Sequence, residues 1–219
     1  MANNKKVCFF VVSVIQPHTS IPFTYGCRSV FSPEERRTQT IKSIQSIKQY
    51  FPQADIIFVE GGATYDDEIR KLVKKYLYLG QYLLCKRAVS NVSKAWGELV
   101  LTILTIFTWL KYDYTFKLSG RYWLNGNVDY QIFTRNTTRV TGLDIYGDNT
   151  QISTRFIGVP RSCYFRYIYA LIRRFWRVPN SNTVYEAYLL KGLSCDKINF
   201  IPTIGVTGFT GVTNELIEE

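Results

Sequence analysis

The chain has 219 residues, of which 46% are hydrophobic, and it carries a formal net charge of +10. This length and composition fit one globular domain, and no Pro/Ser-rich linker divides the chain. The excess of cations favours an anionic partner, such as a nucleotide, a nucleic acid or a membrane surface. Five scattered cysteines without a Cys-x-x-Cys pair argue against a disulfide framework or a zinc site. His18 is the single histidine, which argues against a Ser/His/Asp triad.

The first half of the chain alternates between predicted strands and helices. Apolar runs predict the strands, and a Ser-Pro-Glu-Glu signal at residues 32–35 predicts the start of the first long helix. The predicted elements are a strand at residues 7–15, a helix at 33–51, a strand at 55–60, a helix with apolar positions from 69 to 76, a short strand at 83–84 and a largely apolar helix at 94–111. The helix at 94–111 has an apolar run of twelve residues, which is shorter than the roughly 20 needed to span a bilayer.

A predicted strand at residues 114–118 organises the chain. It stops at Ser119 and Gly120, and it is followed at once by Arg121, Tyr122 and Trp123. In α/β proteins ligands bind at the carboxyl ends of the strands, so this cationic and aromatic cluster is placed for recognition. The alternative is that Arg121 pairs with a surface carboxylate while the rings fill an edge of the core.

The second half is less regular. Two β-rich segments, at residues 139–143 and 153–159, are joined by a turn that carries Asp144 and Asp148. A basic amphipathic helix is predicted at residues 164–177, a final helix with Glu186 at 183–193, and a strand at 199–202. The glycines at 205, 208 and 211 give a weak indication of a loop that approaches phosphate.

This order of elements resembles the GT-A type nucleotide-sugar glycosyltransferases, particularly small enzymes of large DNA viruses and of bacterial polysaccharide loci. The resemblance rests on the first strand, on Glu35-Arg-Arg-Thr-Gln-Thr-Ile-Lys-Ser-Ile44 followed by Ile57-Phe-Val-Glu60, on Ser93-Lys-Ala-Trp-Gly-Glu98 and on Phe116-Lys-Leu-Ser-Gly-Arg-Tyr122. It implies a single Rossmann-like α/β/α sandwich with a mostly parallel sheet over residues 1–219. About residues 1–125 would bind the donor and 126–219 the acceptor. Whether further domains follow residue 219 is left open.

One departure from the family concerns the metal. Most GT-A enzymes end the middle strand in Asp-x-Asp, which holds a divalent ion, whereas this chain has Lys117-Leu-Ser-Gly-Arg121 there. Ser119 alone is a poor ligand for a hard cation, so we expect a metal-independent enzyme without a cofactor, with Mn or Mg as the alternative. Lys94, Lys117 and Arg121 would then neutralise the leaving diphosphate.

The resemblance also suggests a base. Inverting transfer needs a carboxylate that deprotonates the acceptor hydroxyl. Glu186 is the first choice because it lies in the region where the family usually places an acidic acceptor-site residue. Asp144 and Asp148 are its competitors, and a structural salt bridge for Glu186 is the alternative reading.

The expected site and partners follow from these assignments. The donor-binding residues are Arg37, Glu60, Lys94, Lys117, Ser119, Arg121, Gly208 and Thr210, and the acceptor-binding residues are Tyr122 and Trp123. The partners are a nucleotide sugar, with UDP favoured, and an oligosaccharide or glycan acceptor. We expect a cytoplasmic location, in the host if the chain is viral, with peripheral membrane contact left open and no specific nucleic acid. The rival hypothesis is a basic nucleic-acid- or membrane-binding module without catalysis.

Overall fold

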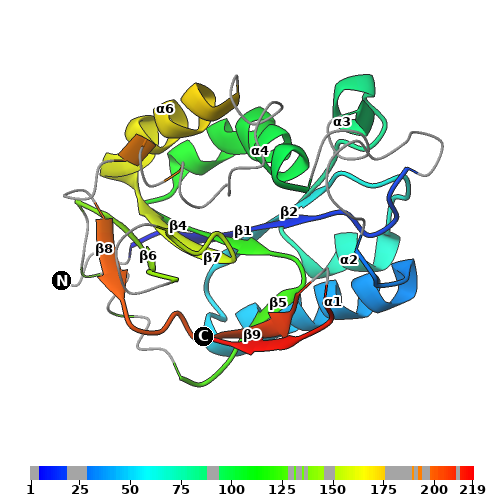
Figure 1. The fold of residues 1–219 in the computed structure, drawn as a ribbon, viewed down its shortest axis with the longest axis horizontal. Helices are drawn as coiled ribbons and strands as arrows, with labels where there is room; N and C mark the ends of the chain where they lie inside the picture. Colours follow the sequence, from blue (N-terminus) through cyan, green and yellow to red (C-terminus); the bar gives the residue numbers. More distant parts are fainter. Residues whose placement is uncertain are drawn as a thin grey trace.

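The computed structural model shows a central β-sheet with helices on both faces (Figure 1). The residues that it describes are 5–18, 29–87, 94–127, 131, 135, 138–145, 151–175, 189, 192–193, 198–210 and 213–219. Their arrangement confirms the expected α/β/α sandwich with a mostly parallel sheet. Among these residues no helix has both the length and the apolar composition that a membrane span requires.

The first half of the chain builds one side of the sheet. Its elements are β1 (Val7–Ser13), α1 (Pro33–Tyr50), β2 (Asp55–Glu60), α2 (Asp67–Leu72), β3 (Lys75–Tyr78) and α3 (Leu83–Arg87). α1 starts where the sequence predicts, because the Ser32 hydroxyl accepts from the Glu35 N–H at 3.2 Å while the Glu35 carboxylate accepts from the Ser32 N–H at 2.7 Å.

The second half adds the remaining strands and the other helical layer. Its elements are α4 (Lys94–Thr105), the 3₁₀ helix η2 (Ile106–Lys111), β4 (Tyr114–Ser119), β5 (Tyr122–Leu124), β6 (Val140–Leu143), β7 (Phe156–Pro160), the 3₁₀ helix η3 (Arg161–Cys163), α6 (Tyr164–Phe175), β8 (Ile198–Ile201), β9 (Val206–Phe209) and β10 (Leu216–Glu218). The two β-rich segments of the sequence do pair antiparallel, as β6 and β7.

The main sheet has the strand order β3-β2-β1-β4-β7-β6-β8. All its strands run in one direction except β7, which is antiparallel to both of its neighbours. The chain fills the sheet outward from β1 through β2 to β3 and then returns to the other side of β1 with β4. The strand order therefore reverses between β1 and β4, and ligands of open α/β sheets bind at such a point.

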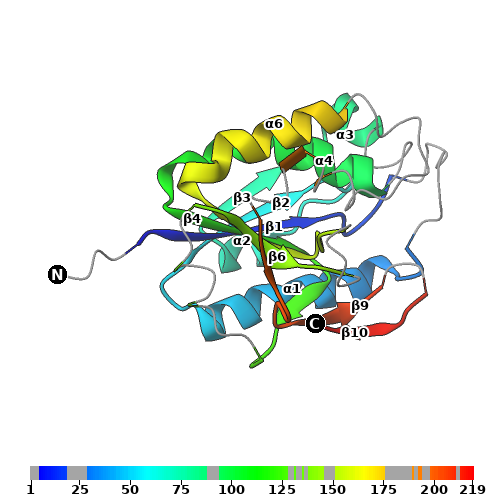
Figure 2. The ribbon, with the colours of Figure 1, turned by 60° about the vertical axis from the view of Figure 1, so that its left-hand side comes forward.

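Helices cover both faces of the sheet (Figure 2), and each face has its own apolar core. One core lies between the sheet and the layer of α4 and α6, where the Trp109 ring stacks on Tyr167 with centroids 5.7 Å apart. The other lies toward α1 and α2, where Phe9, Phe116 and Phe156 stack across three adjacent strands with successive centroids 4.8 and 5.3 Å apart. Side chains alternate between these cores because successive strand residues point to opposite faces.

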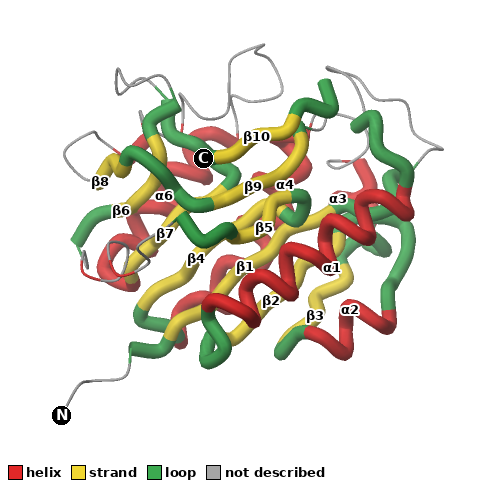
Figure 3. The backbone as a smooth tube through the Cα atoms, turned by 90° about the horizontal axis from the view of Figure 1, so that it is seen from below, coloured by secondary structure: helices red, strands yellow, loops and turns green. Residues whose placement is uncertain are grey.

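A second, three-stranded sheet of order β10-β9-β5 packs beside α1 (Figure 3). The Ser43 hydroxyl of α1 donates to the Tyr122 carbonyl at 2.5 Å, and the Leu124 N–H donates to the Ser46 hydroxyl at 2.9 Å. α1 thus buries serines on the face where an apolar stripe is usual, because they satisfy backbone groups of β5.

Several sequence-based expectations about local structure are wrong. Leu83 and Leu84 start the helix α3 and do not form a strand. The N-cap of α2 is Asp66, whose carboxylate accepts from two backbone N–H groups at 3.0 Å. α2 ends at Leu72, and Tyr76 lies in β3. The sequence suggested one longer helix because a short edge strand of mixed residues resembles a helical stripe. The single helix expected at residues 94–111 ends as the 3₁₀ helix η2.

Candidate functional site

The candidate site lies where the carboxyl ends of β1 and β4 meet. Val12 pairs with Ser119 in the register of these strands, and the Gly120 N–H donates to the Val12 carbonyl at 2.9 Å. A Cβ on Gly120 would lie 2.9 Å from the Cβ of Ser13, so only glycine fits this close approach. Arg121 follows in the turn to β5, at the strand end that the sequence predicts.

Lys117 is buried in β4, with its side chain 2% exposed. Its ammonium group donates to the Glu98 carboxylate, to the Thr154 carbonyl and, at 3.2 Å, to the Ser119 hydroxyl. These three acceptors match the three hydrogens of an ammonium group. Lys117 therefore holds the groups at the end of β4 in place. All three of its ammonium hydrogens are engaged, so none is left for the direct contact with a diphosphate that we expected from the sequence.

Glu98 is a site residue that the sequence analysis does not identify. Glu98 lies one turn after Lys94, a spacing at which an ion pair could form, but the structure pairs Glu98 with Lys117, 19 positions later. The second carboxylate oxygen lies 3.5 Å from the Ser119 hydroxyl, so Glu98 links α4 to the end of β4. Its place directly before the apolar run of α4 was the available signal, because a carboxylate there has to find a buried partner. The side chain of Lys94 lies outside the described residues.

The residues at the end of β4 do not suit a divalent ion. Where Asp-x-Asp enzymes carry two aspartates, this chain has a buried ammonium group and a hydroxyl, and the neighbouring Glu98 carboxylate is already paired with that ammonium group, so it is not free to bind a cation. Over the described parts of the chain, no three His, Cys, Asp or Glu side chains gather as a metal site would require.

Arg121 is half-buried, and its Nη1 lies 3.5 Å from the Ser29 hydroxyl, just before α1 begins. At this distance the hydrogen bond is weak. The guanidinium fork thus lies between the end of β4 and the segment that leads into α1, at the edge where the strand order reverses.

Glu60 closes the neighbouring strand end. It is fully buried, and its Oε1 accepts from the N–H groups of Ile15 at 3.1 Å and of Gly62 at 2.5 Å. Burial raises the pKa of Glu60 to about 8, against the lowering effect of these two hydrogen bonds. Glu60 therefore holds the ends of β1 and β2 together, and a ligand would reach it only if these loops moved.

Arg36 supports the same edge from α1, in a role that the sequence analysis does not assign. Its buried guanidinium donates to the Phe31 carbonyl at 3.2 Å and to the Val14 carbonyl at 2.9 Å. Its positive charge also lowers the pKa of Glu60, although burial has the larger, opposite effect. The N-terminus of a helix that follows β1 lies at the carboxyl edge of the sheet, and this placement was the signal for such a residue.

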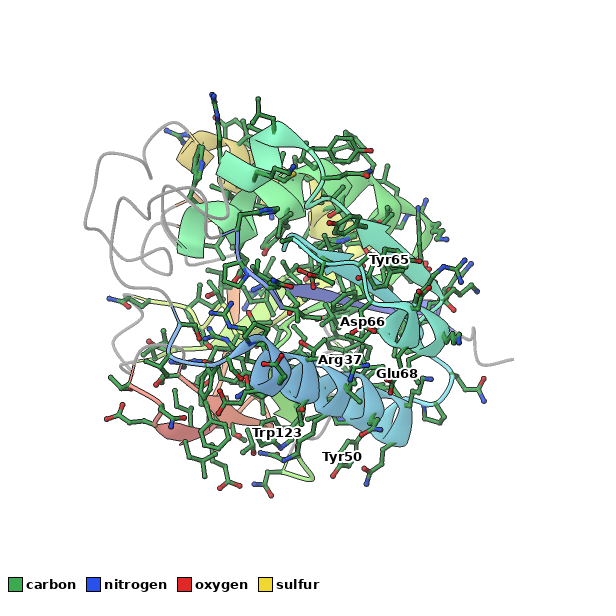
Figure 4. All side chains as sticks on the ribbon, turned by 90° about the vertical axis from the view of Figure 1, so that its right-hand side faces the viewer. Arg37, Tyr50, Tyr65, Asp66, Glu68 and Trp123 are labelled. Carbon is green, nitrogen blue, oxygen red and sulfur yellow. The ribbon has the colours of Figure 1, made fainter. Side chains whose placement is uncertain are left out.

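Arg37, which is expected from the sequence to bind the donor, is engaged in ion pairs in the structure. It forms ion pairs with Asp66, at 2.6 Å, and with Glu68, which tie α1 to α2 (Figure 4). Burial alone would raise the pKa of Asp66, but hydrogen bonds from the Ile69 N–H and from Arg37 outweigh it and lower the pKa. Arg37 is thus engaged in joining the two helices.

The expected acceptor residues, Tyr122 and Trp123, also have structural contacts. Tyr122 is buried in the core toward α1. The Trp123 ring lies under the Lys42 ammonium group, 3.5 Å from the ring centroid, and 6.0 Å from the Phe209 ring. In Figure 4 Trp123 lies on a different side of α1 from Arg37 and Asp66. Tyr122 therefore fills the core, as the alternative expects, whereas Trp123 is half-buried and has the Lys42 ammonium group over its ring.

The middle glycine of the glycine-rich segment lies in a strand, whereas Gly205 precedes that strand and Gly211 lies outside the described residues. Gly208 lies in β9, and a Cβ there would come within 2.4 Å of the Tyr122 ring and 2.6 Å of the Arg121 carbonyl. The glycine is required by the close packing of β9 on β5. Thr210 belongs to the following turn, where its hydroxyl accepts from the Glu215 N–H at 3.1 Å.

The expected carboxylate bases are only partly described. Glu186 and Asp148 lie outside the described residues. Asp144 follows β6, which runs parallel to β4 with β7 between them, and it forms an isolated bridge with Ile152. Asp144 is therefore at the same edge as Ser119, two strand positions away, or about 10 Å at the usual strand spacing.

Solved structures provide the comparisons that match this chain. Neither the family models nor the curated proteins gave a match. The bifunctional glycosyltransferase WbbM superposes with a TM-score of 0.54 at 7% identity, over 92% of this chain and 40% of WbbM. The glycosyltransferase GlyE of Streptococcus pneumoniae TIGR4 gives 0.51 at 9% identity, over 91% of this chain and 45% of GlyE.

A third structure matches over most of both chains. It is a glycosyltransferase involved in the glycosylation of the major capsid of PBCV-1, with a TM-score of 0.51 at 8% identity, over 91% of this chain and 83% of that one. The present chain spans less than half the length of WbbM and of GlyE. The fold of the chain is therefore the GT-A fold of these glycosyltransferases.

Proposed function

We propose that the chain is a glycosyltransferase that moves a hexose or pentose from a nucleoside diphosphate sugar to a hydroxyl of a glycan. The observation that carries the proposal is the coincidence of a GT-A fold with an arginine at the reversal point of the strand order. That edge is where the fold class binds ligands, and a guanidinium fork suits a diphosphate. A UDP-sugar is the first candidate donor.

Arg121 and Ser119 are proposed to contact the diphosphate. Arg121 is not engaged in any of the ion pairs found among the described residues, and Ser119 is the last residue of β4. Lys117 fixes the Ser119 hydroxyl and the end of β4 through its three hydrogen bonds. Glu60 holds the adjacent loops, which the nucleoside would contact.

Metal independence is part of the proposal. The negative charge that builds on the leaving diphosphate would be stabilised by Arg121, with Lys94 as a second cation, in place of a divalent ion. The support is the set of groups at the end of β4, where the Glu98 carboxylate is paired with the Lys117 ammonium group and the Ser119 hydroxyl alone is a poor ligand for Mg or Mn.

The proposed reaction inverts the anomeric carbon. The acceptor oxygen forms a bond to that carbon, the bond from carbon to the diphosphate oxygen breaks, and the hydroxyl proton passes to a carboxylate base. Glu186 is the first candidate base, with Asp144 and Asp148 as alternatives. A viral or bacterial origin is proposed from the same resemblance. Peripheral membrane contact is proposed separately, because it rests on α6 and not on this site.

The test is a panel of UDP-, GDP-, CMP- and dTDP-sugars in buffer with EDTA. Specific binding raises the melting temperature with the logarithm of the donor concentration. We expect one donor to stabilise the protein in EDTA, and the Arg121→Ala variant to bind it more weakly. If no nucleotide sugar stabilises the protein with or without metal, the proposed function is wrong. If stabilisation requires Mn, only metal independence is wrong.

A further inference from the structure

The outer face of α6 presents large apolar side chains to solvent. Phe165, Tyr169 and Ile172 are 74%, 58% and 44% exposed, and their spacing of four and three residues places them in one row. The opposite face, with Tyr164, Tyr167, Ala170 and Leu171, is buried against the sheet. A water-facing row of this kind marks an interaction site when charged residues rim it.

Basic residues rim this row. Arg166 and Arg173 are exposed, seven positions apart, and the Arg173 guanidinium carbon lies 5.6 Å from the centroid of the Tyr169 ring. Every charged residue in η2, η3 and α6 is a lysine or arginine. Asp113, just after η2, accepts a hydrogen bond from the Lys6 N–H at 2.8 Å, and Glu98 of the adjacent α4 is paired inward with Lys117.

The neighbouring helical segment continues the apolar character. Leu104, near the end of α4, is 47% exposed, and Phe107 in η2 is 71% exposed. α4 and α6 lie side by side over the same face of the sheet (Figures 1 and 2). The layer thus combines exposed aromatic and aliphatic groups with cations, which is the composition of helices that lie in a membrane interface.

This composition distinguishes between occupants. A second copy of the chain would bring equal arginine rows together in a symmetric contact, and like charges oppose that contact. A nucleic acid would be attracted by the arginines and could stack on Tyr169. Its binding would not explain why Ile172, Leu104 and Phe107 are also exposed. An anionic bilayer accepts both the cations, at its headgroups, and the apolar groups, below them.

We propose that the outer face of α6, with Phe165, Arg166, Tyr169, Ile172 and Arg173, docks the protein reversibly on a bilayer that contains anionic lipid. The arginines attract the surface, and the apolar row enters the headgroup boundary. This proposal rests only on the residues of the outer face of α6 and does not depend on the proposed glycosyl transfer.

The test is co-flotation of the full chain with vesicles of phosphatidylcholine alone and with about 30% phosphatidylserine, a fraction typical of an anionic leaflet. We expect binding to the anionic vesicles only, and weaker binding at high salt. Arg166→Ser with Arg173→Ser should lower the partition about 25-fold, at about fivefold for each arginine. Phe165→Ser with Tyr169→Ser should also release the protein, and since both side chains are exposed, its melting temperature should stay unchanged.

The matched control is Arg70→Ser with Lys71→Ser on α2, which removes the same charge from the other helical layer. This control should float like the unsubstituted protein, and equal loss in both charge variants would contradict a specific face. Failure to bind anionic vesicles would overturn the proposal. So would vesicle binding that the Phe165 and Tyr169 substitutions leave intact, which indicates a general polyanion site. A solution dimer that these substitutions dissociate would identify a second copy as the occupant.

Discussion

Lys117 of β4 and Glu98 of α4 form an ion pair beneath the candidate site, with the lysine almost completely buried. The pair fixes the polar groups at the end of β4, because the same ammonium group also donates to the Ser119 hydroxyl and the Thr154 carbonyl. Its members are 19 residues apart and lie on different layers, so the pair joins the helical layer to the edge of the sheet.

Removal of Glu98 should therefore destabilise the protein. Glu98→Ala leaves an uncompensated ammonium group in the core, and breaking such a pair costs about 3 kcal/mol, toward the lower end because Glu98 is partly exposed. Urea unfolding measures the loss. Glu98→Gln keeps an acceptor for Lys117 and should lose less. A change below about 1 kcal/mol for Glu98→Ala would show that the pair behaves as a surface pair does.

Because of Glu60, the free energy of unfolding should decrease as pH rises. Its folded pKa of about 8 lies above its ordinary value of 4.5, so the native state binds more protons than the unfolded state between these pH values. The contribution is fully present below pH 4.5 and is lost as pH rises through 8, with a slope of about 1.4 kcal/mol per pH unit at the steepest. In Glu60→Gln, which keeps the acceptor for Ile15 and Gly62, this slope should disappear from urea unfolding curves. Parallel pH profiles for the two proteins would contradict the assignment.

Gly208→Ala should destabilise the protein by about 1–3 kcal/mol, because the new methyl group overlaps the Tyr122 ring and the Arg121 carbonyl. Thermal unfolding measures this loss. The control is Gly126→Ala, where a Cβ would be 3.6 Å from the Tyr50 hydroxyl and should be accommodated. Equal stability of both variants would show that β9 and β5 separate without cost.

Glu186→Gln tests the proposed base. The substitution keeps the size of the side chain but removes the proton acceptor, so we expect transfer to be abolished while donor affinity stays nearly unchanged. Asp144→Asn, at the end of β6, serves as the comparison. Normal transfer by Glu186→Gln with loss of transfer by Asp144→Asn would move the role to Asp144, and normal transfer by both would contradict the inverting mechanism with either base.

Local patterns predicted the elements that carry most of this fold. β2 and β4 are apolar runs with abrupt ends, and α1 has a start and a stop signal, so their bounds agree with the sequence to within one residue. α6 starts at Tyr164 as predicted, and its expected end at residue 177 lies outside the described residues. The small sheet was missed because β5, β9 and β10 are three or four residues long and owe their pairing to α1 and to one another. Strands this short leave hardly any periodicity to read.

The candidate site was predictable in position but not in detail. The apolar run of β4 ends abruptly in the sequence, and this end correctly placed Ser119 and Arg121 at the carboxyl ends of the parallel strands. The Lys117–Glu98 pair and the buried Arg36 depend on packing between layers, which spacing in the sequence does not encode. Gly208 gives the reverse lesson, because a glycine that resembles part of a phosphate loop is required by a strand contact.

Arg121 offers the most direct test of the proposed site. Nucleoside diphosphate release from the donor found in the panel should be measured for the unsubstituted protein, Arg121→Ala and Arg121→Lys, each with its melting temperature. We expect Arg121→Ala to be slower by about 10² to 10³ with little change in stability, and Arg121→Lys to recover only part, because lysine lacks the planar fork. Turnover per folded molecule that is unaltered in Arg121→Ala, with a lowered melting temperature, would contradict the account and leave Arg121 a structural role.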